Sequence, residues 1–192
     1  DKSLTHIWDG NFKREFTEII SKKKKLKLIS FQCTCICENE VLKDGMFILS
    51  GRKFSYNEML DNSKKNLEWI YKNFKDGFDI ALENNNYFNT GAYEIITDGN
   101  FISDLIKKNN IFFLLDIAHA VITAFNKNIN LEDYLNSLPL ENIKQIHICS
   151  PLIDINKKIA LDAHNPPDQK VFDLLKKILI KNKNIEYLTI EY

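Results

Sequence analysis

The sequence predicts an α/β fold built on a parallel sheet, and three observations support this prediction. The five apolar residues 111–115 run without interruption, which is typical of a strand that is buried on both faces. Three further strand-like runs follow the same design at 78–82, 143–148 and 187–190. Amphipathic helical patterns separate these runs, and such alternation favours βαβ units with right-handed crossovers.

The elements can be assigned along the chain from their periodicity. We expect strands over 26–37, 78–83, 111–116, 143–149 and 187–191. Apolar residues at helical spacing predict helices over 11–25, 56–74, 101–108, 119–125, 131–138 and 168–181. The remaining segments are interpreted as loops over 84–99 and 150–167, and as a long loop or hairpin over 38–55 that is suited to a substrate lid. Since no repeat or linker interrupts the pattern, residues 1–192 are expected to form one domain.

Composition excludes several classes of function. Lys and Arg together number 26, as do Asp and Glu, so no global positive charge is available to hold a nucleic acid. Arg14 and Arg52 are the only arginines. No apolar run is long enough for a transmembrane helix, and no signal peptide is expected. The chain begins with Asp1 rather than Met, so a trimmed or incomplete version of a longer protein is expected.

The four cysteines favour a reduced, cytoplasmic compartment because their spacing does not suggest a disulfide framework. Cys33, Cys35 and Cys37 alternate along one predicted strand, so their thiols share one face. Three such thiols could bind a metal, but zinc sites prefer a different spacing. We interpret them as buried apolar residues.

Polar residues gather at the C-terminal ends of the predicted strands or in the loops just after them. In parallel α/β folds, the chemistry is placed at those ends. Mixed imidazole and carboxylate ligands suit Fe, Zn or Mn. A set of seven exceeds what a single ion needs, so two or three metals are plausible. The predicted metal ligands are Glu83, Asp116, His119, His147, Asp162, His164 and Glu191.

Other interpretations of these residues stay open. An Asp at a strand end often caps the next helix, and a single His is often a hydrogen-bonded core residue. Cys149 and Ser150 beside His147 suggest nucleophilic catalysis, but the glycines of a nucleophile elbow are absent around them. A structural role for all seven predicted ligands at matched strand ends is a much weaker explanation than a metal site.

Several of these stretches resemble a known family. They are Ala81-Leu82-Glu83-Asn84, Leu114-Leu115-Asp116-Ile117-Ala118-His119, Leu138-Pro139-Leu140 into Ile146-His147, Asp162-Ala163-His164 and Ile190-Glu191. Together they resemble the xylose-isomerase-like TIM-barrel superfamily. Within it, their order is most similar to the DUF692-like multinuclear non-haem iron-dependent oxidative enzymes, over residues 56–192.

This resemblance implies a TIM-type (β/α) barrel whose mouth holds two or three irons. It implies an enzyme that uses oxygen to modify residues, often cysteines, of ribosomally made peptides, sometimes with a partner protein that presents the peptide. A complete barrel needs about 250 residues, so we expect the first strands to be missing at the N-terminus. The chain also departs from the family pattern at His119, where an Asn is common, at Pro151, where another His is usual, and at Gln32-Cys33, where Glu-His is common.

Three other functions remain as alternatives. An endonuclease-IV-like zinc phosphodiesterase shares similar motifs but needs a basic surface that this neutral chain lacks. A sugar-phosphate isomerase or epimerase would use one divalent metal, such as Mn, with Glu83 and Glu191 flanking a small-molecule substrate. A degenerate barrel could bind a peptide or partner protein without turnover.

Overall fold

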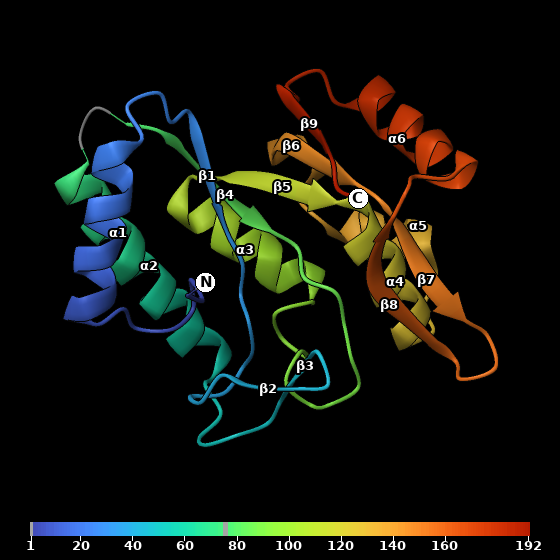
Figure 1. Cartoon of the computed structure of the whole chain (residues 1–192), viewed down its shortest axis with the longest axis horizontal. Helices are drawn as coiled ribbons and strands as arrows, with labels where there is room; N and C mark the ends of the chain where they lie inside the picture. Colours follow the sequence, from blue (N-terminus) through green and yellow to red (C-terminus); the bar gives the residue numbers. More distant parts are fainter. Residues whose placement is uncertain (1, 75–76) are drawn as a thin grey trace.

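The central feature of the computed structural model, which describes residues 2–74 and 77–192, is a five-stranded parallel sheet (Figure 1). The strand order is β1-β4-β5-β6-β9, and each neighbouring pair is parallel. The strands are β1 (Leu28–Phe31), β4 (Asp79–Glu83), β5 (Phe112–Asp116), β6 (Ile143–Ile148) and β9 (Tyr187–Ile190). The predicted α/β class and parallel pairing are therefore confirmed, and the sheet corresponds to half of a barrel.

The middle strand is buried on both faces, as its continuous apolar sequence predicts. Phe113, Leu114 and Leu115 of β5 are fully buried. Such burial on both faces is typical of a central strand in a parallel sheet. The C-terminal end of β5 is therefore held in a dry, closely packed environment, and its last residue, Asp116, is buried too.

Helices connect the strands, and most begin at a side chain that caps them. They are α1 (Gly10–Lys22), α2 (Tyr56–Asn73), α3 (Gly99–Asn109), α4 (Ile117–Lys127), α5 (Leu131–Ser137), the short 3-10 helix η1 (Leu140–Asn142) and α6 (Gln169–Lys181). Ser55 and Glu58 form a capping box at the start of α2, which satisfies two backbone N–H groups. Among the described residues, no helix is both long and apolar enough to cross a membrane.

Strand β1 is shorter than the predicted strand over 26–37. Phe31 pairs with Leu82, close to the end of β4, so the chain beyond Phe31 has little of a neighbouring strand to bond. The segment bonds elsewhere instead: Ile36 donates its backbone N–H to the carbonyl of Ala92. Cys33, Cys35 and Cys37 lie in this segment and are all buried, which confirms their interpretation as core residues.

Two antiparallel hairpins lie outside the main sheet. The first, β2 (Val41–Lys43) with β3 (Met46–Ile48), confirms the hairpin alternative for 38–55. The second, β7 (Ser150–Asp154) with β8 (Ile159–Asn165), occupies the segment for which we predicted a loop. That prediction is wrong because the apolar pair Leu152 and Leu161 lies across the hairpin, and the Asp154 side chain accepts the backbone N–H of Lys157 in the turn.

Candidate metal centre

The ends of three adjacent strands bring together Glu83, Asp116 and His147. Glu83 is the last residue of β4, Asp116 is the last residue of β5, and the sheet register pairs Asp116 with His147 on β6. One ligand atom from each side chain lies within 4.8 Å of the other two. We call these three residues the inner group. These residues lie close together because parallel pairing places the C-terminal ends of neighbouring strands along one edge of the sheet.

Asp116 serves the fold and the candidate site with different oxygen atoms. Its Oδ1 accepts the backbone N–H of His119 at 2.8 Å and so caps α4, which confirms that it acts as a helix cap. Its Oδ2 is buried and has no hydrogen-bond partner. Burial raises the pKa of this carboxyl group, although the positive charge of His119 opposes the shift. A bound cation would satisfy the unpartnered oxygen and favour the ionised form.

Asn84 fixes the backbone of Asp116. Its side-chain oxygen accepts the Asp116 N–H at 2.9 Å, and its side-chain nitrogen donates to the Asp116 carbonyl at 3.0 Å. The carbonyl of Asn84 also accepts a hydrogen bond from His119 Nδ1 at 2.8 Å. Sequence reasoning did not assign this role to Asn84, and its only signal was an amide directly after the strand-end Glu83.

The His119 ring reaches back from the first turn of α4 into the cluster. Because Nδ1 donates to a carbonyl, the other ring nitrogen, Nε2, is available to a metal. Nε2 lies 3.3 Å from Asp162 Oδ2 and 4.0 Å from Asp116 Oδ2. Burial lowers the pKa of His119, but Asp116, Asp162 and Glu83 outweigh it and raise the pKa to about 10. Without a cation, a proton on His119 balances these carboxylates.

His147 presents Nδ1 to two carboxylates. This atom lies 3.0 Å from Glu191 Oε1 and 3.6 Å from Glu83 Oε1, yet it is buried and has no partner in hydrogen-bonding geometry. Its Nε2 accepts a hydrogen bond at 2.8 Å from the Gln145 amide, which also donates to Thr189. Gln145 was not identified from the sequence, because its position within a strand gives no sign of this contact.

Glu83 lies at the centre of these contacts. Burial raises its pKa, but the interactions with His147, His119 and Gln32 outweigh it and lower the pKa overall. Gln32, directly after β1, donates to Glu83 Oε2 at 2.9 Å. A polar side chain therefore lies at or near the C-terminal end of each of the adjacent strands β1, β4, β5 and β6, and these side chains surround Glu83 or include it.

The hairpin β7–β8 adds Asp162 and His164 to the cluster. Asp162 Oδ2 lies 3.3 Å from His119 Nε2 and 3.3 Å from His164 Nε2. Burial raises the pKa of Asp162, but its contacts with His119 and His164 outweigh that effect and lower it. The His164 side chain is half exposed. All seven predicted ligands are thus linked by short contacts, and their role as metal ligands stays a prediction.

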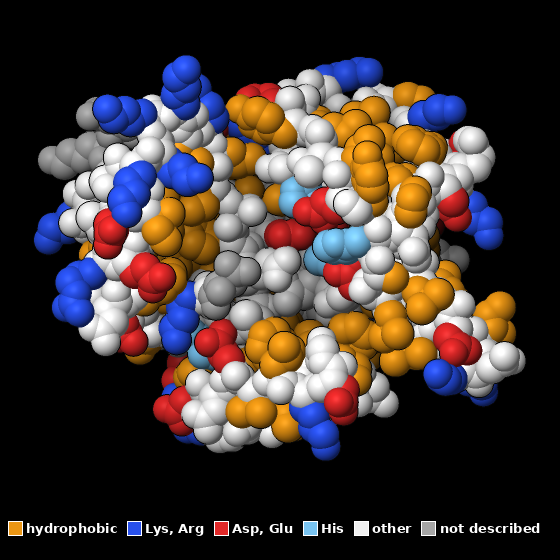
Figure 2. Space-filling view, in the orientation of Figure 1, with side chains coloured by type: hydrophobic (Ala, Val, Ile, Leu, Met, Phe, Trp, Pro, Cys, Tyr) orange, Lys and Arg blue, Asp and Glu red, His pale blue; other side chains and the backbone are white. Residues whose placement is uncertain are grey.

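The donor set of this cluster fits a divalent cation. Two of its buried polar atoms, Asp116 Oδ2 and His147 Nδ1, have no hydrogen-bond partner, and such atoms call for an explanation such as an ion. The donors are imidazole nitrogens and carboxylate oxygens, which suit Fe, Zn and Mn. Figure 2 shows histidine and acidic side chains gathered beside a hollow on this face of the molecule.

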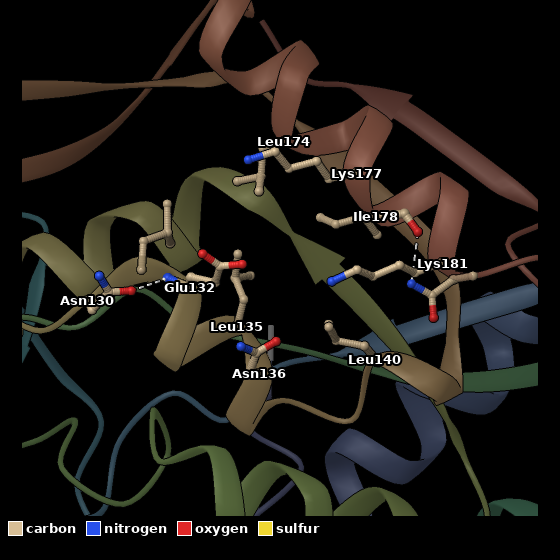
Figure 3. A pocket seen from close by; sticks show the side chains of 11 residues that line it. Asn130, Glu132, Leu135, Asn136, Leu140, Leu174, Lys177, Ile178 and Lys181 are labelled. Carbon is tan, nitrogen blue, oxygen red and sulfur yellow. Dashed lines mark hydrogen bonds between the residues drawn. The ribbon is translucent and has the colours of Figure 1, made fainter.

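Two cavities differ in their relation to this cluster. A cavity of about 360 Å³ between α1 and β1 is lined by aromatic residues and reaches Gln32 and Glu83. A second cavity, of about 320 Å³, lies between α5 and α6, and none of the seven predicted ligands lines it (Figure 3). Only the first of these two cavities adjoins the candidate centre.

Part of this chain is similar in sequence to proteins from other organisms. A UPF0276 protein of Caulobacter vibrioides is 24% identical over 88 residues, which cover 46% of this chain and 31% of that protein. A UPF0276 protein of Acaryochloris marina is 28% identical over 90 residues, which cover 47% and 32%. The aligned segments thus span about a third of the length of these relatives.

A solved structure and a family match complete the comparison. The apo crystal structure of 3-keto-D-glucoside 4-epimerase from E. coli matches with a TM-score of 0.51 and 16% identity, over 86% of this chain and 57% of that one. At this identity the likeness shows the fold alone, which is that of a TIM barrel. Residues 57–192 match the family described as RiPP precursor modification enzyme MbnB/TglH/ChrH. The chain therefore belongs to this family of enzymes that modify the precursors of ribosomally made peptides.

Proposed function

We propose that this chain is a metal-dependent oxidative enzyme that modifies a cysteine residue of a ribosomally made peptide, with two or three iron ions bound by the seven predicted ligands. The observation that carries the proposal is their convergence at the C-terminal ends of the strands, in a chain that belongs to a family of peptide-modifying enzymes. Zinc and manganese are the alternative metals for the same donor set.

Some residues of the chain would bind the metal, and others would orient those ligands. The inner group would hold one ion, with Glu191 beside His147 and with His119 presenting Nε2. Bound iron supplies one-electron redox chemistry that protein side chains lack. Asn84 and Gln145 orient ligands through their hydrogen bonds, and partners of this kind tune metal affinity.

The cavity beside Glu83 is the candidate binding site for the peptide. Phe12, Phe16 and Phe31 line it and offer an apolar surface, while Gln32 and Glu83 lie at its polar end. This layout suits a peptide whose apolar residues bind in the cavity while a neighbouring side chain reaches the metal centre. A partner protein that presents the peptide is compatible with this site and belongs to the proposal.

The zinc phosphodiesterase alternative gains no support from the arginines. Arg14 bonds Asn11, and Arg52 forms two hydrogen bonds with Glu58. Both arginines are therefore engaged by nearby side chains.

The test is a reaction with a peptide of defined sequence. The protein is purified without oxygen, its iron, zinc and manganese are measured together, and it is then mixed in air with a cysteine-containing precursor peptide identified from its gene neighbourhood. We expect two or three irons per chain and a mass change on the peptide that localises to a cysteine. A matched peptide with that Cys replaced by Ala should keep its mass. An iron-loaded enzyme that changes neither peptide, with or without an added partner protein, would contradict the proposal.

A further inference from the structure

We propose that Cys149, Asp162 and His164 form a second metal position, with the Cys149 thiolate as a ligand, next to the inner group. This inference rests on the proposed metal centre, and it adds a sulfur donor that the sequence did not predict. One ligand atom from each of these three side chains lies within 4.8 Å of the other two. We call them the outer group.

The ligand atoms of the outer group lie within 4.8 Å of one another, which can be compared with the spacing around a bound metal. Ligand atoms around a tetrahedral ion with one sulfur and one nitrogen donor are separated by about 3.5 Å, given metal–sulfur and metal–nitrogen bonds of about 2.3 and 2.0 Å. A bound metal would draw the three ligand atoms to that separation. His164 has room to move because its side chain is 52% exposed. Cys149 is fully buried, so it offers a fixed anchor.

The backbone of the hairpin is irregular where it carries the outer group. His164 has a φ of +47°, in the left-handed region that residues other than glycine rarely adopt. The pairing of β7 with β8 shifts register between Ser150 and Leu152, just after Cys149, and Ser150 pairs with Asn165, next to His164. Strain and irregular pairing of this kind cluster at functional sites. Here they accompany the approach of His164 to Cys149 and Asp162.

Asp162 connects the two groups. The same oxygen, Oδ2, lies 3.3 Å from His164 Nε2 in the outer group and 3.3 Å from His119 Nε2 beside the inner group. A carboxylate in this place can contact a metal in either position, or bridge two of them. The outer group is thus continuous with the proposed centre and is not an isolated surface cluster.

The chemistry of the outer group selects the class of metal. Thiolate and imidazole donors favour Zn²⁺, Fe²⁺ or Co²⁺ over Mg²⁺ or Ca²⁺, which prefer oxygen ligands. On binding, the S–H bond of Cys149 breaks, the proton leaves to solvent, and a sulfur–metal bond forms without any change in oxidation state. Cys33 is an internal comparison, because it is also buried but belongs to neither candidate metal-binding group.

Cobalt provides a direct test, because Co²⁺ bound by a thiolate shows a near-ultraviolet charge-transfer band, while its visible bands report bound Co²⁺ whatever the ligands. Co²⁺ is titrated into the metal-free protein, and we expect both kinds of band. Cys149→Ser should lose the charge-transfer band and keep visible bands from the inner group. Cys33→Ser is the matched control and should keep both. Persistence of the charge-transfer band in Cys149→Ser, or its absence from wild type that has bound Co²⁺, would overturn the inference.

Two further variants keep the test decisive. His164→Ala changes a half-exposed side chain and should fold even where Cys149→Ser does not, as far-ultraviolet circular dichroism will show. It should weaken the Co²⁺ affinity reported by the charge-transfer band by about tenfold or more. An unchanged titration would overturn the inference. Asp116→Asn should reduce the visible bands and spare the thiolate band, so that failure of the inner group is seen separately from failure of the outer group.

Discussion

The inner and outer groups of the candidate centre differ in what holds them. The side chains of Glu83, Asp116 and His147 are 10%, 1% and 12% exposed, at the ends of three paired strands. The side chains of Asp162 and His164 are 25% and 52% exposed, on a hairpin with an irregular register. The sheet therefore fixes the inner group before any metal binds. Within the outer group, Asp162 and His164 have more freedom than the fully buried Cys149, and we expect their order to depend more on the metal.

The largest expected loss of metal affinity comes from changing Asp116 to Asn. The amide oxygen can still cap α4, but the negative charge beside His119 and Glu83 is lost. Metal affinity of the inner group should fall by more than the about 10–100-fold typical of losing a partner of a ligand. Calorimetric titration with Fe²⁺ under anaerobic conditions measures this change. Asp98→Asn is the matched control, since Asp98 caps α3 and is not a predicted ligand. Equal affinities of both variants would contradict the role of Asp116.

A smaller loss of metal affinity is expected from changing Gln145 to Leu. A metal on His147 Nδ1 requires a proton on Nε2, and the Gln145 amide can turn its oxygen to accept that proton. Loss of this partner should weaken Fe²⁺ binding by about 10–100-fold. Gln169→Leu, on the exposed surface of α6, controls for the loss of an amide. If both variants bind Fe²⁺ like wild type, Gln145 does not orient His147.

The contrast between the groups predicts that metal stabilises His164→Ala less than it stabilises the wild type. Without metal, the free energy of unfolding of the variant should lie within about 0.5 kcal/mol of the wild-type value, because the His164 side chain is half exposed. With saturating Co²⁺, it should gain less in melting temperature than wild type, since one binding position is weakened. Thermal melts with and without Co²⁺ compare the two. An equal gain would show that His164 contributes nothing to binding.

The smallest expected effect is on the stability of the metal-free protein, which should depend on pH through His119. Its pKa in the metal-free fold is raised to about 10, from 6.5, since nearby carboxylates outweigh burial. A raised pKa means that the stabilisation is fully present below about pH 6.5 and is lost as the pH rises towards 10. The difference in melting temperature between metal-free wild type and His119→Gln should therefore shrink over this range. A constant difference would argue against protonated His119 as the balancing charge.

The same contrast explains how much could be predicted from the sequence. Apolar runs revealed the sheet, and its parallel order placed Glu83, Asp116 and His147 together, since strand ends follow directly from periodicity. The hairpin at 150–165 was missed because its short alternating pattern is interrupted by polar turn residues. Asn84 and Gln145 could not be found from spacing, because their partners are set by the three-dimensional register of neighbouring elements.

Metal content is the measurement that tests the central claim most directly. The protein and its Asp116→Asn variant are purified without oxygen, and their iron, zinc and manganese are counted by mass spectrometry. We predict two or three irons per wild-type chain, and fewer in Asp116→Asn, with Asp98→Asn matching wild type. Wild-type protein that binds no metal when reconstituted with any of these ions, or a variant with unchanged metal content, would contradict a metal centre at the strand ends.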